Sequence, residues 1–354
     1  MSEGGPGPRT EPPARSRGER AARLRRVATG QRFFAVLVLL VVLFVAFSAT
    51  QDRFFTSANI EALLTSAAIL WVVSIGLTFV MLAGGFDLSI GSLLALSSIA
   101  LGTFFNDLGV PAVVAIVMTL LFGALLGGGV NGVLVGRLGL SFLVVTLGTL
   151  ILFRGVLNLW SDTKTEQVLS SLLDSLAFDK FLEIPIPVWV MALTFLVALY
   201  VQRSTYFGRD VYAVGGNPEA ARLSGVKVAR TIIAVYAISG MLAAFGGVLQ
   251  TARIGAASPQ VGEAVLFDAA AAVLLGGTSF AGGVGGVGGT AVGVLFLATL
   301  QNGLSVSGVE SFWQQIITGA ILLVAILLDR IQRQGLVSVG IRVGRRARAG
   351  PAED

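Results

Sequence analysis

Long runs of apolar residues, separated by short polar stretches, follow one another along the chain from Phe33 to about residue 331. Each run is close to the roughly 20 residues that a helix needs to cross a bilayer of about 30 Å. The runs are residues 33–49, 62–83, 88–106, 111–135, 141–160, 187–203, 231–252, 264–281, 286–305 and 312–331. Asp268 and the Gly276-Gly277 pair interrupt the eighth run. The pattern predicts an all-α integral membrane protein with about ten transmembrane helices and glycine-rich interruptions.

Two polar regions flank the membrane domain, which we place at residues 32–331. Residues 1–31 are rich in Gly, Pro and Arg and contain almost no large apolar residues, so we expect a disordered basic cytoplasmic tail. Residues 332–354 form a second basic tail, also expected in the cytoplasm. The run Phe33–Phe47 resembles the core of a cleaved signal peptide, but the basic region before it is far longer than usual for such a signal. We therefore interpret this run as the first span.

The composition agrees with a membrane protein and excludes several kinds of chemistry. Hydrophobic residues make up 55% of the chain and charged residues 13%, far from the averages of soluble domains. The chain has no Cys and no His, so thiol chemistry, imidazole bases and zinc sites built on these residues are excluded. The isoelectric point near 10.1 would suit a nucleic-acid-binding protein only if the basic residues shared one folded face. Because they are scattered between apolar runs, we expect no nucleic acid partner.

The positions of the basic residues instead indicate membrane topology. When ten spans are threaded from a cytoplasmic N-terminus, most of the 25 Lys and Arg residues fall on the cytoplasmic side, in both tails, at Arg137 and in the 203–230 loop. Arg53, Lys164, Lys180 and Arg253 fall outside, and Arg154 lies within a span. Since both tails are rich in Arg, the number of crossings is even, which supports keeping the interrupted eighth run. We expect a multi-pass protein of the cell inner (plasma) membrane with both termini in the cytoplasm.

Glycine is unusually frequent, with 45 residues, and two of its runs have a helical period. Gly128, Gly132 and Gly136 recur every four residues in the fourth run, and so do Gly285, Gly289 and Gly293 at the start of the ninth. Small residues on one face let membrane helices approach closely. Packing within the chain is the simpler interpretation, and a subunit interface or a moving surface is the alternative.

A pump needs an energy source, and this chain shows no phosphate-binding loop of the Gly-Lys-Ser/Thr type. Its three lysines follow Thr163, Asp179 and Val226, so none follows a glycine. The 203–230 loop is the longest polar stretch between spans on the expected cytoplasmic side. Within it, Gly215-Gly216-Asn217-Pro218 is a turn signal, after which Asn217 caps a short helix, Pro218 takes its first position and Glu219 favours its N-terminal dipole. From these signals alone, an ordinary surface helix remains the simplest interpretation.

Two glycine-containing stretches within the apolar runs are candidates for a substrate pathway. Interrupted membrane helices can form binding sites because they expose helix ends to a cavity. We therefore nominate Gly84, Gly85, Asp87 and Ser89 in the first stretch, and Gly276, Gly277, Thr278 and Ser279 in the second. Asp87 carries the most notable charge, and it either caps the third segment or contacts substrate. Arg154 and Asp268 are further charges near the ends of spans, and Arg154 has no evident local partner.

The expected external loop at 161–186 contains EQVLSSLLDSL. Its apolar positions share one helical face and its polar positions the other, which predicts a helix lying on the membrane surface. The apolar set is Val168, Leu169, Leu172, Leu173 and Leu176.

The strings described so far resemble those of one family. Glu219-Ala220-Ala221 followed by Gly225 matches the E-A-A-x-x-x-G core of ABC importer permeases, and the wider string from Gly208 resembles the permeases of ribose- and xylose-type sugar importers. GGFDLSIGS at 84–92, LLGGTSFAGGVGGVGGT at 274–290 and QNGLSVSGVESFW at 301–313 resemble the same family. The likeness runs from about residue 54 to 331. The Leu-Pro ending used by other importer classes is missing after Gly225.

The resemblance implies a function, partners and a coupling site. It implies that residues 32–331 are a permease domain that moves a monosaccharide, a pentose or a hexose, inward. It implies coupling to a separate ATPase subunit, which carries ATP and Mg, through Gly215, Gly216, Asn217, Glu219, Ala220, Ala221, Ser224 and Gly225. It also implies a periplasmic or lipid-anchored sugar-binding protein and a second permease chain, expected as a homodimer in the lipid bilayer. We expect no cofactor, no metal and no catalytic residue in this chain.

Other function classes stay open at this point. A permease of the same family could carry a nucleoside or a signalling sugar derivative, because the pathway stretches indicate little beyond polarity. An ion-coupled secondary transporter would usually place several carboxylates or histidines in its spans, whereas His is absent and the acidic residues lie mostly in loops. No set of catalytic groups converges, which speaks against a membrane enzyme.

Overall fold

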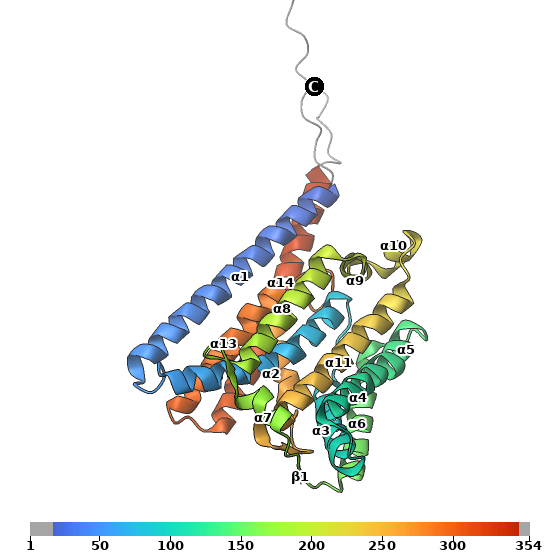
Figure 1. The fold of residues 1–354 in the computed structure, drawn as a ribbon. Coiled ribbons are helices and arrows are strands. Elements are labelled where there is room, and N and C mark those ends of the chain that lie inside the picture. The colour runs from blue at the N-terminus through green and yellow to red at the C-terminus, as the bar shows by residue number, and fades with distance from the viewer. Residues whose placement is uncertain (1–16, 347–354) are drawn as a thin grey trace, which may run out of the picture.

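A computed structural model describes the backbone of residues 17–346 and the side chains of residues 34–331. The chain is an all-α membrane protein, as predicted (Figure 1). The long helices are α1 (Arg17–Thr50), α2 (Ser57–Leu82), α3 (Ile90–Gly102), α4 (Ala112–Ala124), α6 (Phe142–Ser161), α8 (Ile186–Ser204), α11 (Val228–Ile254), α13 (Val287–Val306) and α14 (Ser311–Arg346). The shorter ones are α5 (Val133–Gly136), α7 (Ser171–Phe178), α9 (Tyr206–Gly216), α10 (Pro218–Leu223) and α12 (Val265–Leu275), with π-helical turns η1 (Thr103–Asp107) and η2 (Leu125–Gly132).

The predicted spans correspond to helices over the part of the chain that the structure describes. Eight helices, counted with their π-helical extensions, are long and apolar enough to cross a membrane. Two further predicted spans appear as shorter apolar helices, Phe34–Thr50 within α1 and α12. The boundary expected at residue 31 does not coincide with a helix end, because α1 begins at Arg17. The rest of the expected N-terminal tail, and the last eight residues of the C-terminal tail, lie outside the described residues.

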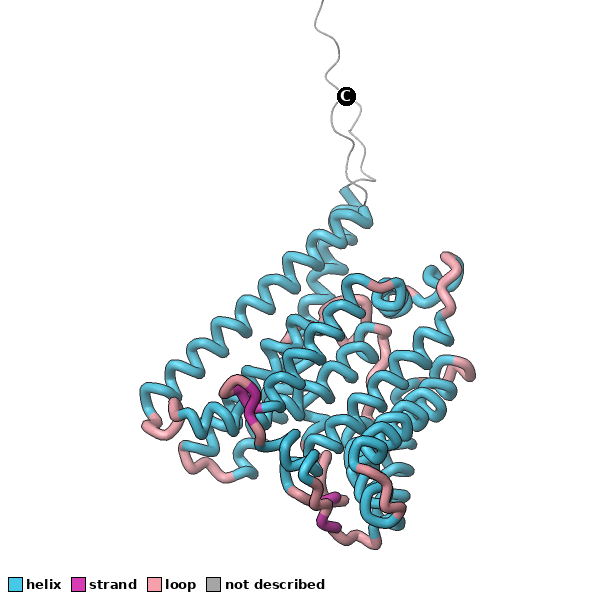
Figure 2. Tube along the Cα trace, viewed as in Figure 1, coloured by secondary structure: helices cyan, strands magenta, loops and turns pink. Residues whose placement is uncertain are grey.

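The helices form a bundle with a buried centre and an apolar rim (Figures 1 and 2). Every residue of α3 is buried, and α2 and α11 are buried along most of their length. By contrast, α4, α6, α8 and α14 expose many Leu, Val and Ile side chains. Such side chains are suited to contact with lipid, so the rim of the bundle lies against the hydrocarbon of the membrane. We name the two ends of the bundle after helix α10 and strand β1 (Glu166–Gln167), which mark them, as the α10 end and the β1 end.

The glycines of the fourth span pack within the chain. This span is built from α4, η2 and α5, and it lies along α11. A Cβ placed on Gly128 would lie 2.7 Å from the Cβ of Ala237, one on Gly132 2.8 Å from the Cα of Ile233, and one on Gly136 2.8 Å from the carbonyl oxygen of Ala229. Because real side chains do not approach so closely, these positions need glycine. The interpretation as internal packing is confirmed.

The glycines near the ninth span divide into two groups. Gly289 and Gly293 lie on α13, where a Cβ would overlap the backbone of Gly276 and of Ala272 on α12. Gly285 instead precedes the helix and has a φ of +113°, so the prediction that it shares a helix face is wrong. A left-handed backbone at this point is available to glycine at little cost.

The structure divides the eighth predicted span, residues 264–281, between a helix and a loop. Its helix, α12, has 11 residues and ends at Leu275, earlier than predicted, because Gly277 adopts a φ of +84° and turns the chain. The preceding segment starts at strand β4 (Ala256–Ala257), where a Cβ on Gly102 would lie 2.9 Å from the Cβ of Ala257. It continues through turns at residues 259–264 along α3, where Gly262 meets the backbone of Gly91.

The 161–186 loop differs from its prediction. Its first part is strand β1 (Glu166–Gln167), which pairs antiparallel with β4, and β2 (Lys180–Phe181) pairs with β3 (Ile184–Pro185) in a hairpin. The helix, α7, begins only at Ser171 and buries Leu173 and Ala177. Leu169 lies outside the helix and is exposed, so the predicted apolar face is wrong there. At residues 166–167, strand pairing with β4 therefore outweighs the local preference for a helix.

Candidate functional site

The predicted coupling helix exists and begins as the sequence indicates. The side chain of Asn217 accepts a hydrogen bond from the backbone N–H of Ala220 at 3.0 Å, which makes Asn217 the N-cap of α10. Pro218 takes the first position, where its missing N–H costs nothing. Glu219 lies in the first turn and pairs with Arg222. Helix capping depends on neighbouring residues alone, so the sequence was sufficient to predict where α10 begins.

The end of α10 is a tight turn that only glycine accommodates well. The Ser224 hydroxyl donates to the carbonyl of Ala220 at 2.9 Å, and the N–H of Val226 donates to the carbonyl of Ala221. Gly225 has a φ of +87°, and a Cβ placed on it would meet nothing within 4 Å. Within the chain, the role of Gly225 is therefore this left-handed conformation and not a close approach of two backbones.

The surface of α10 faces outward at the end of the bundle (Figure 1). Glu219, Ala220 and Ser224 are exposed, whereas Ala221 is buried against the rest of the chain. Leu223 is 87% exposed, an unusual state for a leucine at a polar helix tip. Sequence reasoning missed Leu223 because a single leucine in a short amphipathic helix looks like a core residue.

The turn predicted at residues 215–218 falls at Asn217, and Gly215 and Gly216 are the last residues of α9 before it. A Cβ on Gly215 would overlap the carbonyl oxygen of Leu82, the last residue of α2. The same Leu82 carbonyl accepts a hydrogen bond from the N–H of Gly283 at 2.9 Å. Glycine at 215 is therefore required by close packing between the coupling segment and two other parts of the chain.

Both candidate pathway loops meet at this point. A Cβ on Gly282 would lie 2.6 Å from the Cα of Gly84, and one on Gly283 would lie 3.0 Å from the Cα of Gly216. The rings of Phe86 and Phe280 stack at 5.2 Å between centroids. The loop after α2 and the loop after α12, nearly 200 residues apart, thus touch each other and the C-terminal end of α9. We call this contact the glycine junction.

A chain of hydrogen bonds through Gln202 and Tyr212, which we call the polar relay, holds the loop after α12. The Tyr212 hydroxyl on α9 donates to the carbonyl of Gly285 at 2.6 Å and accepts from the Gln202 side-chain amide at 2.6 Å. The Gln202 carbonyl oxygen accepts from the N–H of Val287, the first residue of α13, at 2.8 Å. Burial raises the pKa of Tyr212, so its hydroxyl stays protonated and able to donate. Sequence reasoning missed this relay, because no local pattern links a Gln at the end of α8 to a loop 80 residues away.

Asp87 is fully buried and acts at the start of α3. Its Oδ1 accepts from the backbone N–H of Ser89 at 3.0 Å and from the Ser89 hydroxyl at 2.6 Å, and its Oδ2 accepts from the Ser239 hydroxyl at 3.0 Å. Asn131 donates to the Ser89 hydroxyl at 2.8 Å. The contact with the N–H two residues ahead is of the capping kind, one of the two roles expected for Asp87, although Ser89 itself holds the N-cap position.

The second predicted pathway stretch is also engaged inside the chain. The Thr278 hydroxyl accepts from the N–H of Gly286 at 3.2 Å, and the Ser279 hydroxyl donates to Asp329 on α14 at 3.1 Å. Gly276 packs against Gly289, and Gly277 turns the chain. In the first stretch, a Cβ on Gly85 would lie 3.1 Å from the Tyr236 hydroxyl. These residues shape the two loops, and none of them is openly exposed.

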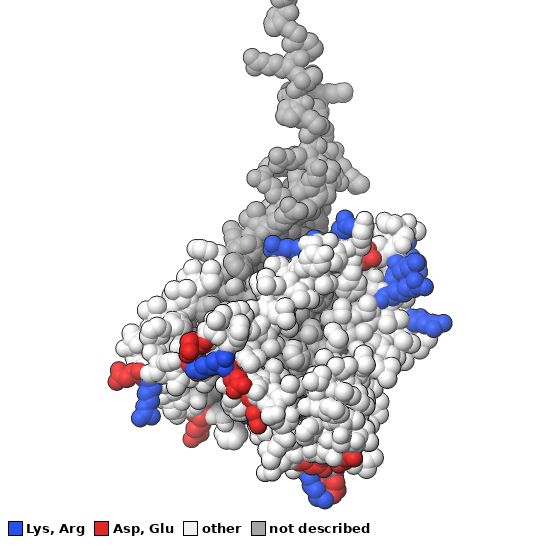
Figure 3. All heavy atoms as spheres, viewed as in Figure 1, with Lys and Arg blue, Asp and Glu red and all other residues white. Residues whose placement is uncertain are grey.

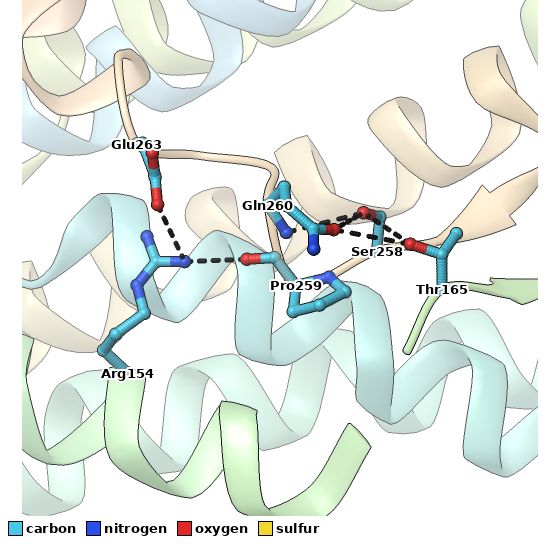
Figure 4. A network of polar contacts seen from close by, with 6 residues as sticks. All are labelled: Arg154, Thr165, Ser258, Pro259, Gln260 and Glu263. Carbon is cyan, nitrogen blue, oxygen red and sulfur yellow. Dashed lines mark hydrogen bonds and ion pairs between the residues drawn. The ribbon is translucent and has the colours of Figure 1, made fainter. Parts of the chain in front are cut away.

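Arg154 has partners that the sequence did not reveal (Figure 4). Its guanidinium donates to the carbonyl of Pro259 at 2.7 Å and lies 4.0 Å from a carboxylate oxygen of Glu263. Both partners belong to the turns before α12. Next to them, Ser258 donates to Gln260 at 2.6 Å, and Thr165 donates to Ser258 at 3.1 Å. Over residues 34–331, no group of three His, Cys, Asp or Glu side chains could hold a metal ion.

Comparison with known proteins identifies the family. Residues 59–326 match the family described as "Branched-chain amino acid transport system / permease component". The chain is 37% identical to the ribose import permease protein RbsC of Escherichia coli (strain K12) over 318 residues, covering 86% of this chain and 98% of the relative. It is 40% identical to RbsC of Bacillus subtilis (strain 168) over 300 residues, covering 84% and 91%.

A third relative is more distant, and the solved structures give no match. The xylose transport system permease protein XylH of Escherichia coli (strain K12) is 32% identical over 358 residues, covering 84% of this chain and 91% of the relative. No solved structure matches the chain. The family match covers both candidate pathway loops and α10, as the resemblance of the motifs predicted. The chain therefore belongs to the membrane permease components of ribose- and xylose-type importers.

Proposed function

We propose that this chain moves a neutral monosaccharide, a pentose in the first place, into the cell as the permease subunit of an ABC importer. Its similarity to ribose and xylose permeases over more than four-fifths of its length supports the substrate class. The single observation that carries the mechanism is the position of α10, which is exposed at one end and joined through α9 to both candidate pathway loops.

The α10 end faces the cytoplasm in this proposal. Figure 3 shows Lys and Arg gathered at that end, while acidic and basic side chains mix at the β1 end. Arg137, Arg209, Arg222 and Lys227 lie in the turns and short helices around α10, Arg203 lies in the last turn of α8, and Arg230 lies in the first turn of α11. Short loops with an excess of positive charge stay in the cytoplasm. Both chain termini would then lie in the cytoplasm as well, and the β1 end would face a periplasmic or lipid-anchored sugar-binding protein.

An ATPase subunit that binds ATP and Mg docks on α10. The residues that would meet it are Glu219, Ala220 and Ser224, with Leu223 entering a groove of the partner. Gly215 passes the movement on, because its packing against Leu82 and Gly283 leaves no free space, and the backbone of Gly216 lies against Gly283. A shift of α9 thus displaces the loops after α2 and α12 together. A second copy of the chain completes the passage, and the two copies serve two ATPase domains and one binding protein.

Leu223 offers a direct test of docking, because its side chain is exposed and supports nothing within the chain. Replacing Leu223→Asp should abolish co-purification of the ATPase subunit and sugar uptake while leaving the amount of permease in the membrane unchanged. Leu169→Asp is the matched control, since Leu169 is 69% exposed at the opposite end. Normal co-purification of the ATPase with the Leu223→Asp protein would refute the assignment of α10.

Two alternative functions differ from the proposed one, the first in its cargo and the second in its energy source. The family description mentions branched-chain amino acids, so the family alone does not fix the cargo. Competition of labelled ribose uptake by xylose, by nucleosides and by leucine distinguishes a pentose permease from one for a nucleoside or sugar derivative. An ion-coupled carrier would retain uptake without the ATPase subunit and lose it when the sodium or proton gradient is removed.

A further inference from the structure

Charged residues of the segment before α12 lie near the middle of the membrane bundle. The depth follows from α11, which has 27 residues and crosses the whole bundle. On this helix, Ser239 bonds Asp87, and Gly247 packs against Leu94. Gly91 lies one helical turn before Leu94, so it faces the middle third of α11. Gly262 stacks on the backbone of Gly91 and therefore lies at the same depth.

The residues that follow Gly262 carry charge and are not enclosed by this chain. The side chain of Glu263 is 74% exposed, and that of its partner Arg154 is 25% exposed. Arg154 lies in the second half of α6, inside a span. On the first turn of α12, Phe267 is 54% exposed, and Asp268 accepts a hydrogen bond from the Gln301 amide of α13 at 3.0 Å.

This exposure is incompatible with lipid contact. A carboxylate facing hydrocarbon is costly, and intramembrane charges face the bundle interior or a water-filled cavity. The Arg154 contact at 4.0 Å covers only part of the Glu263 carboxylate. Lipid-facing positions of the same bundle look different, because the exposed residues on the side of α6 away from Arg154 are Leu152, Val156 and Leu159. The face with Glu263 must therefore meet water.

We propose that Arg154, Glu263, Phe267, Asp268 and Gln301 line a water-filled passage and form an intramembrane binding point for a neutral sugar. Carboxylates accept hydrogen bonds from sugar hydroxyls, while the Gln301 amide and the Arg154 guanidinium donate to hydroxyl oxygens. The Phe267 ring offers an apolar surface to the C–H face of a sugar ring.

According to this proposal, the cargo contacts residues at the start of α12 and not the two candidate pathway loops. The loop residues Asp87, Thr278 and Ser279 are buried and bonded within the chain, so they have little to offer a passing sugar. The new site rests on the proposed transport function for its ligand, but its contact with water can be measured without transport. The two parts of the proposal are therefore tested separately.

The first experiment uses the Cys-free chain in membrane vesicles with its ATPase subunit. Glu263→Cys and Phe267→Cys should react with a charged, water-soluble thiol reagent. Leu152→Cys is the control, because Leu152 is 54% exposed and, two residues from Arg154, lies on the opposite side of α6. If Glu263→Cys is as unreactive as Leu152→Cys, a second copy or lipid covers this face and the passage is refuted.

The second experiment separates sugar contact from a structural role. Asp268→Asn keeps the shape of the side chain and can still bond Gln301, but it removes the charged acceptor. Uptake of labelled ribose should fall by about tenfold or more, the usual effect of losing a hydrogen bond to a charged group. ATP hydrolysis stimulated by the binding protein should persist. Full ribose and xylose uptake by Asp268→Asn, in vesicles where the unchanged chain transports them, would overturn the sugar site and leave the transport function standing.

Discussion

The oxygen atoms of the Tyr212 hydroxyl and the Gly285 carbonyl lie 2.6 Å apart, so α9, the helix before α10, holds a loop at the foot of α13. The bond is partly buried and is extended by Gln202, which accepts from the N–H of Val287, the first residue of α13. The consecutive helices α8 and α9 thus share one hydrogen-bond relay with a loop that lies 73 residues beyond Tyr212. A relay of this kind transmits movement only while every member stays bonded.

Replacing Tyr212→Phe should uncouple ATP hydrolysis from transport. The ring still packs, but the relay loses both bonds of the hydroxyl, which costs about 1 kcal/mol for each. We expect ATP hydrolysis to remain stimulated by the binding protein, while sugar moved per ATP falls several-fold. Tyr206→Phe is the control, because Tyr206 lies on the same helix and is 81% exposed. An unchanged ratio of sugar to ATP in the Tyr212→Phe protein would argue against the relay.

Gly215 and Gly216 are adjacent in the sequence, but they should differ in their tolerance of a larger side chain. A Cβ on Gly215 would overlap the Leu82 carbonyl, whereas nothing lies within 4 Å of one on Gly216. Gly215→Ala should destabilise the permease by about 1–3 kcal/mol or more, the usual range for overpacking. Gly216→Ala should be close to neutral. Thermal unfolding of the two purified proteins in detergent checks this, and equal midpoints would mean that the glycine junction is looser than the structure shows.

Asp87 should behave as a structural residue. In Asp87→Ala, the buried groups of Ser89 and Ser239 lose their acceptor, which costs about 1–3 kcal/mol for each group left unsatisfied. Asp87→Asn keeps one acceptor oxygen, so it should restore most of the stability and most of the uptake. Thermal stability and ribose uptake are measured together. If Asp87→Asn is stable but inactive, Asp87 has a role in transport beyond capping.

The orientation of the bundle can be tested with single cysteines at exposed positions of the two ends. Thr165 lies next to β1, and Ser224 lies at the end of α10. In intact cells, an impermeant thiol reagent should label Thr165→Cys and leave Ser224→Cys unlabelled. After the cells are opened, both should react. Labelling of Ser224→Cys in intact cells would invert the proposed topology and remove α10 from the cytoplasm.

Local signals in the sequence predicted the elements well. Apolar runs located the spans, and Asn217 with Pro218 located the start of α10, because hydrophobicity and capping act over a few residues. The glycine period in the fourth span correctly indicated internal packing. The turn expected at residues 215–218 begins only at Asn217, since a Gly-Gly pair signals either a turn or close contact, and only the position of Leu82 decides between them.

Long-range contacts could not be predicted from the sequence. The relay of Gln202 and Tyr212, and the pairing of Arg154 with Glu263, join residues whose positions depend on the whole bundle. The length of α12 was also overestimated. An apolar run such as 264–281 has the same hydropathy whether it forms one helix or a helix followed by a loop, and the positive φ of Gly277 becomes evident only in three dimensions.

The shortness of α12 has a consequence for how the protein is made. With 11 residues, α12 covers about 16 Å, half of the bilayer, so it cannot leave the insertion channel as a span of its own. Its preceding segment runs through turns and carries Glu263, which cannot enter lipid unaccompanied. We therefore expect residues 255–275 to enter the membrane together with α13, as a hairpin, and not as an independent span.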